Sequence, residues 1–81
     1  MEEEEKVKWD GFDGAIIGSC YYTNRYIYDT DIMITTLMAR DGMSYLDAWE
    51  HLEFNVLNHH LTDDDGKYIT PIHLVREYEI D

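Results

Sequence analysis

The stretch DTDIMITTLMARDGMSYLDAWEHLEFNVLN, residues 29–58, decides the fold because it encodes two consecutive helices and the turn between them. Its initial DTD supplies capping oxygens and negative charge near a helix N-terminus. Apolar side chains then recur at helical spacing. We expect a first helix from about Thr30 to Arg40, ended by Gly42 in a left-handed cap.

A second helix is predicted from about Tyr45 to Asn58. Ser44 and Asp47 resemble a capping box in which Asp replaces the usual Glu. On a helical wheel one face carries Tyr45, Ala48, Trp49, Leu52 and Val56, and Phe54 lies nearly opposite. A helix this apolar must be covered on more than one side, by the first helix and the sheet or by a partner subunit. We favour cover from within the chain.

On the N-terminal side, DGFDGAIIGSC, residues 10–20, leads into a hairpin. A first strand begins at Ala15 and extends toward Tyr22, Thr23-Asn24 forms the turn, and Tyr26–Tyr28 forms the second strand. The glycine spacing of three and then four fits no phosphate-binding fingerprint, and the neighbouring acids would repel phosphate. These glycines are therefore interpreted as turn residues.

On the C-terminal side, residues 62–66 are expected to form a loop, followed by a third strand from Lys67 to about Tyr78. Pro71 places that strand at a sheet edge or interrupts it. The predicted fold is a small α+β domain of order β-β-α-α-β. An antiparallel sheet, made of the hairpin and the C-terminal strand, carries an αα-hairpin on one face. Residues 1–8 are predicted to be a mobile acidic tail, and 9–81 a single domain.

Charge is the strongest feature of the composition. Eighteen Asp and Glu against six Lys and Arg give a formal net charge of -12. Because the cations are scattered singly, we expect neither direct nucleic-acid binding nor attraction to anionic membranes. The field instead favours encounter with a basic protein surface, although acidity that serves only solubility is an equal alternative. Cys20 is the only cysteine, no apolar run is long enough to span a membrane, and the N-terminus is acidic. We therefore expect a cytoplasmic protein.

No pattern of residues selects a catalytic or metal site. Cys20 has no histidine near it in sequence and is expected to act as a small apolar side chain. His59, His60 and Asp63–Asp65 are residue types that bind metal ions. However, their spacing does not match the EF-hand loop, and the side chains of adjacent histidines point in different directions on a helix. We expect a solvated acidic loop, no cofactor and no enzymatic activity.

Several short motifs occur in a recognisable order. They are DGFDGAIIG, Tyr28-Asp29, L-x-x-x-D-G-M-S-Y at 37–45, A-W-E-x-L-E-F-N at 48–55 and T-P-I at 70–72. In this order the chain resembles a family of small tailed-bacteriophage proteins over residues 10–72. Several members carry a lysine in the first turn of the first helix, where this chain has Asp31-Ile32-Met33, so no role of that lysine is transferred. The resemblance implies a phage product acting inside a bacterial cell.

The charge and the resemblance together predict an anti-CRISPR-like inhibitor. An acidic surface can occupy a cationic groove made for phosphates, and the expected partner is a basic host defence protein such as a CRISPR effector component. The alternatives are an accessory or structural phage module, for example a homodimer through the second helix, and a metal-dependent enzyme at His59, His60 and Asp63.

The residues predicted to bind the partner are of two kinds. The acids are Asp10, Asp13, Asp29, Asp31, Asp47, Glu50, Glu53, Asp63, Asp64 and Asp65. The aromatic anchors are Tyr21, Tyr22 and Phe54, since exposed aromatic side chains are typical of binding surfaces.

Overall fold

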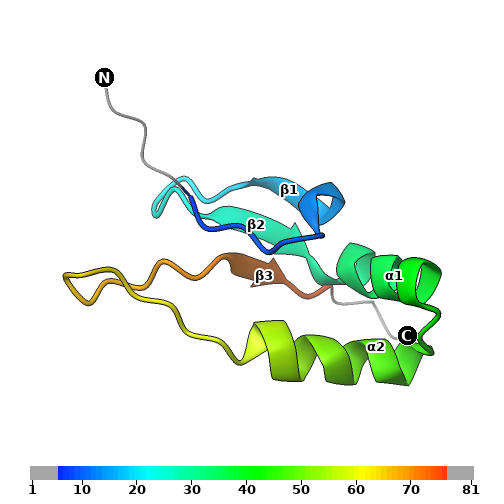
Figure 1. The fold of residues 1–81 in the computed structure, drawn as a ribbon. Helices are drawn as coiled ribbons and strands as arrows, with labels where there is room; N and C mark the ends of the chain where they lie inside the picture. Colours follow the sequence, from blue (N-terminus) through cyan, green and yellow to red (C-terminus); the bar gives the residue numbers. More distant parts are fainter. Residues whose placement is uncertain (1–5, 77–81) are drawn as a thin grey trace, which may run out of the picture.

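A computed structural model describes residues 6–76, which fold into a three-stranded sheet and an αα-hairpin (Figure 1). In chain order the elements are a 3-10 turn η1 (Asp13–Ala15), β1 (Ile16–Ser19), β2 (Tyr26–Asp29), α1 (Thr30–Asp41), α2 (Tyr45–Leu52), a π-helical turn η2 (Glu53–Leu57) and β3 (Ile72–Leu74). The predicted α+β class and the order β-β-α-α-β are confirmed.

The sheet is mixed. β1 pairs antiparallel with β2, as predicted, but β3 pairs parallel with β2, so the prediction of a wholly antiparallel sheet is wrong. The cause is the path of the chain in Figure 1: α2 runs back beside the sheet, and an arm over residues 61–69 reverses the direction once more. Within the arm, Asp63 N donates to Lys67 O over 2.9 Å and Ile69 N to Leu61 O over 2.8 Å. Parallel pairing needs such a long crossover.

β3 is shorter than predicted. It begins at Ile72, directly after Pro71, and lies at the edge of the sheet order β1-β2-β3. Proline has no N–H to give to a ladder, which explains both the start and the edge position. The predicted continuation to Tyr78 extends beyond the described residues.

The N-terminal segment contacts the hairpin. Lys6 Nζ donates to Ser19 Oγ over 2.8 Å and lies 4.7 Å from the centroid of the Tyr26 ring. Lys8 Nζ lies 6.0 Å from the same centroid. Residues 1–5 of the predicted tail lie outside the described residues.

The core lies where the αα-hairpin meets the sheet. Its buried apolar side chains are Phe12, Ala15, Tyr28, Met33, Ile34, Leu37, Ala48, Leu52 and Val56. The last three are four residues apart and form one stripe along α2 and η2. In the described part of the chain, neither helix has the length and apolar composition needed to cross a bilayer.

The predicted caps position both helices. The Asp29 side chain accepts from the N–H groups of Asp31 and Ile32, and Gly42 ends α1 with φ 70°. Ser44 Oγ accepts from Asp47 N over 3.1 Å at the start of α2. These contacts confirm the predicted starts of both helices and the glycine stop between them.

The second helix changes form before its predicted end. From Glu53 to Leu57 it is a π-turn, in which Asn58 N donates to Glu53 O over 3.3 Å. Asn55 Nδ2 donates to His51 O over 3.0 Å, so a side chain occupies the carbonyl that Asn55 N would reach in an α-helix. A side chain inserted into the ladder in this way shifts the helix register.

Candidate functional site

The outer side of α2 and η2 carries a ridge of uncovered side chains. Leu46, Glu50 and Phe54 are four residues apart and therefore align on the side away from the buried stripe. Leu46 and Phe54 are each 74% exposed. We call these three residues the α2 ridge. Because no described part of the chain covers it, our expectation of cover from within the chain holds for the buried stripe and is wrong for the ridge.

The α2 ridge is strongly acidic. Glu50 lies on it, and Asp47 and Glu53 lie close by, all three exposed. None of the three forms an ion pair with a described residue, and residues 43–58 contain no Lys or Arg. The ridge therefore combines uncovered apolar side chains with uncompensated negative charge.

A surface hollow of about 370 Å³ adjoins the ridge. Its lining is Met43, Asp47, Glu50, His51, Phe54 and Asn55. The structure thus brings four predicted binding residues together, Asp47, Glu50, Glu53 and Phe54, on one helical surface.

Other predicted acids lie elsewhere. Asp10 and Asp13 are exposed near η1, and Asp13 Oδ2 lies 3.9 Å from Lys8 Nζ. Asp64 and Asp65 are exposed at the end of the arm, which projects away from the start of α2 in Figure 1. The Asp63 carboxylate accepts from Asp65 N over 2.9 Å and from Lys67 N over 3.0 Å, so it shapes its own loop.

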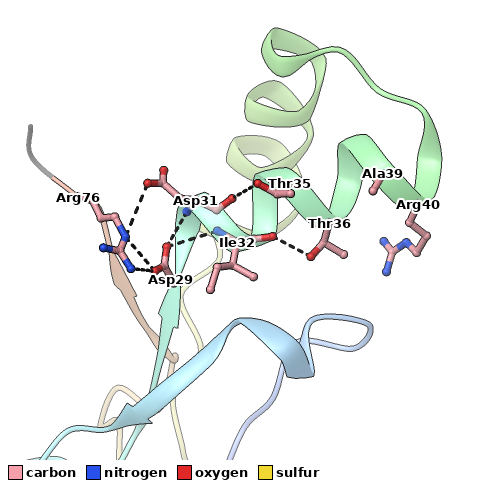
Figure 2. Close-up of a pocket in the computed structure, with 8 residues that line it drawn as sticks. All are labelled: Asp29, Asp31, Ile32, Thr35, Thr36, Ala39, Arg40 and Arg76. Atoms are coloured by element: carbon pink, nitrogen blue, oxygen red, sulfur yellow. Dashed lines mark hydrogen bonds and ion pairs between the residues drawn. The ribbon is translucent and has the colours of Figure 1, made fainter.

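Asp29 is not available to a partner, which corrects its predicted role. Its side chain is fully buried. As Figure 2 shows, Oδ2 accepts from Arg76 Nη2 at 2.5 Å and from Arg76 Nε at 3.0 Å, while Oδ1 accepts from the first turn of α1. The bonds from Arg76, aided by the α1 N–H groups and opposed by burial, lower the pKa of Asp29 from its ordinary value of 3.8.

Asp31 also faces this cluster. Its carboxylate lies 3.8 Å from Arg76 Nε and is partly buried. Asp29 and Asp31 therefore belong to a contact that joins α1 to the segment after β3. They add little to an acidic binding surface.

A groove of about 640 Å³ runs along the outer side of α1. Figure 2 shows its lining: Asp29, Asp31, Ile32, Thr35, Thr36, Ala39, Arg40 and Arg76. Thr35 and Thr36 donate their hydroxyl protons to helix carbonyls four residues back. Two carboxylates balance two guanidinium groups, so this groove lacks the acid excess that the predicted partner requires.

The predicted anchors Tyr21 and Tyr22 lie at the tip of the β1–β2 hairpin. They are 92% and 89% exposed, and their rings stack edge to face at 5.3 Å. Asn24 takes φ 60° in the predicted turn. Figure 1 places this tip at the same end as the arm and away from the start of α2. The two tyrosines therefore form a second exposed surface, separate from the α2 ridge.

Cys20 follows β1 instead of lying inside it, because the strand ends at Ser19. The residue is partly buried, and hydrogen bonding by Thr23 lowers the pKa of its thiol from the ordinary value of 9.0. The described residues contain no group of three His, Cys, Asp or Glu side chains placed to hold a metal ion. The structure thus gives no support to the metal site considered at His59, His60 and Asp63.

Three of the four histidines meet in a place that sequence reasoning missed. His59, His60 and His73 line a cavity of about 420 Å³ together with Arg25, Leu57, Tyr68, Thr70 and Pro71. Trp9 Nε1 donates to His73 Nε2 over 3.1 Å, and the two rings stack at 6.0 Å. Burial lowers the pKa of His73 from its ordinary value of 6.5. Because the lining comes from three separate segments, around residues 25, 57–60 and 68–73, no local motif could have indicated it.

Comparison with protein-family models finds no match, and comparisons with curated proteins and with solved structures find no significant similarity.

Proposed function

We propose that this chain is a phage-encoded inhibitor that binds a basic, nucleic-acid-binding host defence protein, for example a CRISPR effector component. The α2 ridge and its neighbours Asp47 and Glu53 contact the cationic surface that the target uses for nucleic acid. Inhibition follows because the target cannot hold phosphates and these carboxylates at the same place.

The observation that carries the proposal is the uncovered α2 ridge with its unpaired acids. Leu46 and Phe54, two turns apart on the same helical face, leave large apolar areas in water, as the side chains of an interaction surface do. The acids beside them have no cation to neutralise them within residues 43–58. A basic partner with an apolar depression would cover both features at once.

The alternative is a phage accessory or structural module that forms a homodimer through α2. A two-fold contact would place the ridge of one copy against the same ridge of the other. Glu50 and its acidic neighbours would then face equivalent carboxylates, and like charges at an interface oppose association. The ridge therefore favours a partner of opposite charge.

The first experiment is affinity capture from a bacterial lysate at low and at high salt, with identification of the eluted proteins. We expect one or a few basic, nucleic-acid-binding proteins that high salt releases. The purified partner should then lose nucleic acid when the chain is added. Retention of nucleic acid in the presence of the bound chain would contradict inhibition by occupation of the site.

A charge-reversal pair locates the contact. The triple variant Asp47→Lys, Glu50→Lys and Glu53→Lys should lose binding and the salt dependence of binding. The control variant Asp10→Lys, Asp64→Lys and Asp65→Lys makes the same change in net charge on exposed acids away from the ridge. Equal loss in both variants would show that net charge, and not the ridge, controls binding. Equal retention would remove the acids from the proposal.

A further inference from the structure

Two of the side chains that line the cavity with His59 and His60 each carry a buried nitrogen without a hydrogen-bond partner among the described residues. Among the described residues, the buried side-chain nitrogens with no hydrogen-bond partner are Arg25 Nε and His73 Nδ1. Both belong to side chains that line this one cavity. Buried polar groups are normally paired, because an unpaired one costs about 1–3 kcal/mol. Two such groups on side chains that line one cavity favour a ligand that supplies hydrogen-bond acceptors there.

The chemistry of each nitrogen can be assigned. His73 Nε2 accepts from the indole N–H of Trp9, so in the neutral ring the proton resides on Nδ1. Burial lowers the pKa of this ring, which favours the neutral form. Arg25 Nε carries a proton under all ordinary conditions. Both groups are therefore donors, and a ligand that pairs with them must offer acceptors such as oxygen.

The charge of Arg25 indicates that the acceptor is an anion. Arg25 is partly buried, and its Nη1 donates to Thr70 O over 2.8 Å, a neutral carbonyl. It forms no ion pair with a described residue. By contrast, each of the other described arginines, Arg40 and Arg76, is paired with a carboxylate. A partly buried guanidinium without a carboxylate partner is suited to bind one from a ligand, or a phosphate.

We propose that this cavity binds a small ligand through an oxyanion group, a carboxylate or a phosphate, held by Arg25 and His73. The volume of about 420 Å³ falls within the range of small-molecule sites. His60 and Tyr68, whose rings meet edge to face at 6.3 Å, form an aromatic wall for the rest of the ligand. The site is separate from the α2 ridge, so this proposal does not depend on the proposed function and is tested independently of it.

The test is an NMR titration of the full chain, labelled with ¹⁵N, against inorganic phosphate and, separately, against acetate at constant ionic strength. We expect the Arg25 Nε–H and His73 ring signals to shift and to saturate with one of the two anions. Saturation with phosphate alone assigns a phosphate ligand, and saturation with acetate alone assigns a carboxylate. If neither anion gives a saturable shift at these two side chains, the proposal is wrong.

Variants distinguish this site from general attraction of anions to cations. Arg25→Gln should weaken binding about tenfold or more, since a hydrogen bond to a charged group is lost. Arg40→Gln is the matched control, because Arg40 also donates Nη1 to a backbone carbonyl, that of Gly11 at 3.0 Å. Equal effects of the two variants would overturn the proposal.

A second variant separates a loss of binding from a loss of folding, because Arg25→Gln could cause either. Arg25→Lys keeps the positive charge and removes Nε–H, and its far-ultraviolet circular dichroism reports whether the fold persists. We expect a folded protein with binding intermediate between the wild type and Arg25→Gln. Wild-type affinity in Arg25→Lys would show that Nε–H does not hold the anion, and would overturn its assigned role.

Discussion

Asp29 links three parts of the molecule through one carboxylate. It ends β2, caps α1 through Oδ1, and binds Arg76, 47 residues further along the chain, through Oδ2. Next to it, Thr30 Oγ1 donates to Leu74 O. The junction between the αα-hairpin and the last strand thus depends on two adjacent buried polar side chains.

Replacing Asp29 should reveal this dependence as a function of pH. Because the pKa of Asp29 is lower in the folded chain than its ordinary value of 3.8, ionisation stabilises the folded state above that value. This stability is lost as the pH falls through the folded pKa. Asp29→Asn should therefore cost about 1–2 kcal/mol near neutral pH, and the difference from the wild type should shrink below pH 3.8.

Urea denaturation over a pH series measures this effect. Asp31→Asn is the control, since Asp31 is only partly buried and its carboxylate lies 3.8 Å from Arg76. A difference between the wild type and Asp29→Asn that stays constant with pH would contradict the role assigned to the ionised carboxylate.

At the level of elements, the sequence predicts those features that depend on neighbouring residues. Asp29, Ser44 and Gly42 act on backbone groups within a few positions, so the starts of both helices and the stop of α1 could be predicted. The π-turn could not, because it depends on the rotamer with which Asn55 reaches His51 O. The second role of Asp29 was also missed, since nothing in the sequence pairs it with Arg76.

Gly42 is predicted to be required at the end of α1. Its φ of 70° lies in the left-handed region, and nothing lies near a Cβ added there. Gly42→Ala should therefore destabilise by about 1 kcal/mol through backbone strain alone. Gly18→Ala is the control, because its added Cβ also meets nothing and its φ lies outside that region. Thermal melts of both variants test this, and equal melting temperatures would contradict it.

The α2 ridge should contribute to binding and not to folding. Leu46→Ser and Phe54→Ser alter side chains that are 74% exposed, so each should change the free energy of unfolding by less than about 0.5 kcal/mol. Leu52→Ala, on the buried stripe of the same helix, should cost about 2–5 kcal/mol. Urea denaturation gives all three values. A large loss in Phe54→Ser would mean that the ridge serves the fold.

At the level of the whole molecule, the charge of -12 acts on stability. Like charges repel in the compact state, and salt screens that repulsion. The melting temperature should therefore rise between low and high sodium chloride. The variant Asp10→Lys, Asp64→Lys and Asp65→Lys should show a smaller rise, because its net charge is closer to zero. A melting temperature that falls with salt would show that attractive ion pairs dominate.

The overall topology was predictable only in part. The hairpin, the two helices and their order follow from local patterns, and the structure confirms them. The direction of β3 depends on where the arm leads the chain, and the histidine cavity depends on β3 in turn, since His73 lies on that strand. Neither the direction of β3 nor the histidine cavity could be predicted without knowing the three-dimensional path of residues 58–71.

The parallel pairing of β3 also sets the order in which the molecule can fold during synthesis. Its partner β2 leaves the ribosome more than forty residues earlier, and the parts between them make mostly local contacts. The hairpin and the two helices can therefore collapse first. One edge of β2 then stays open on the nascent chain until residues 72–76 emerge, and their arrival closes the sheet and supplies Arg76 to Asp29.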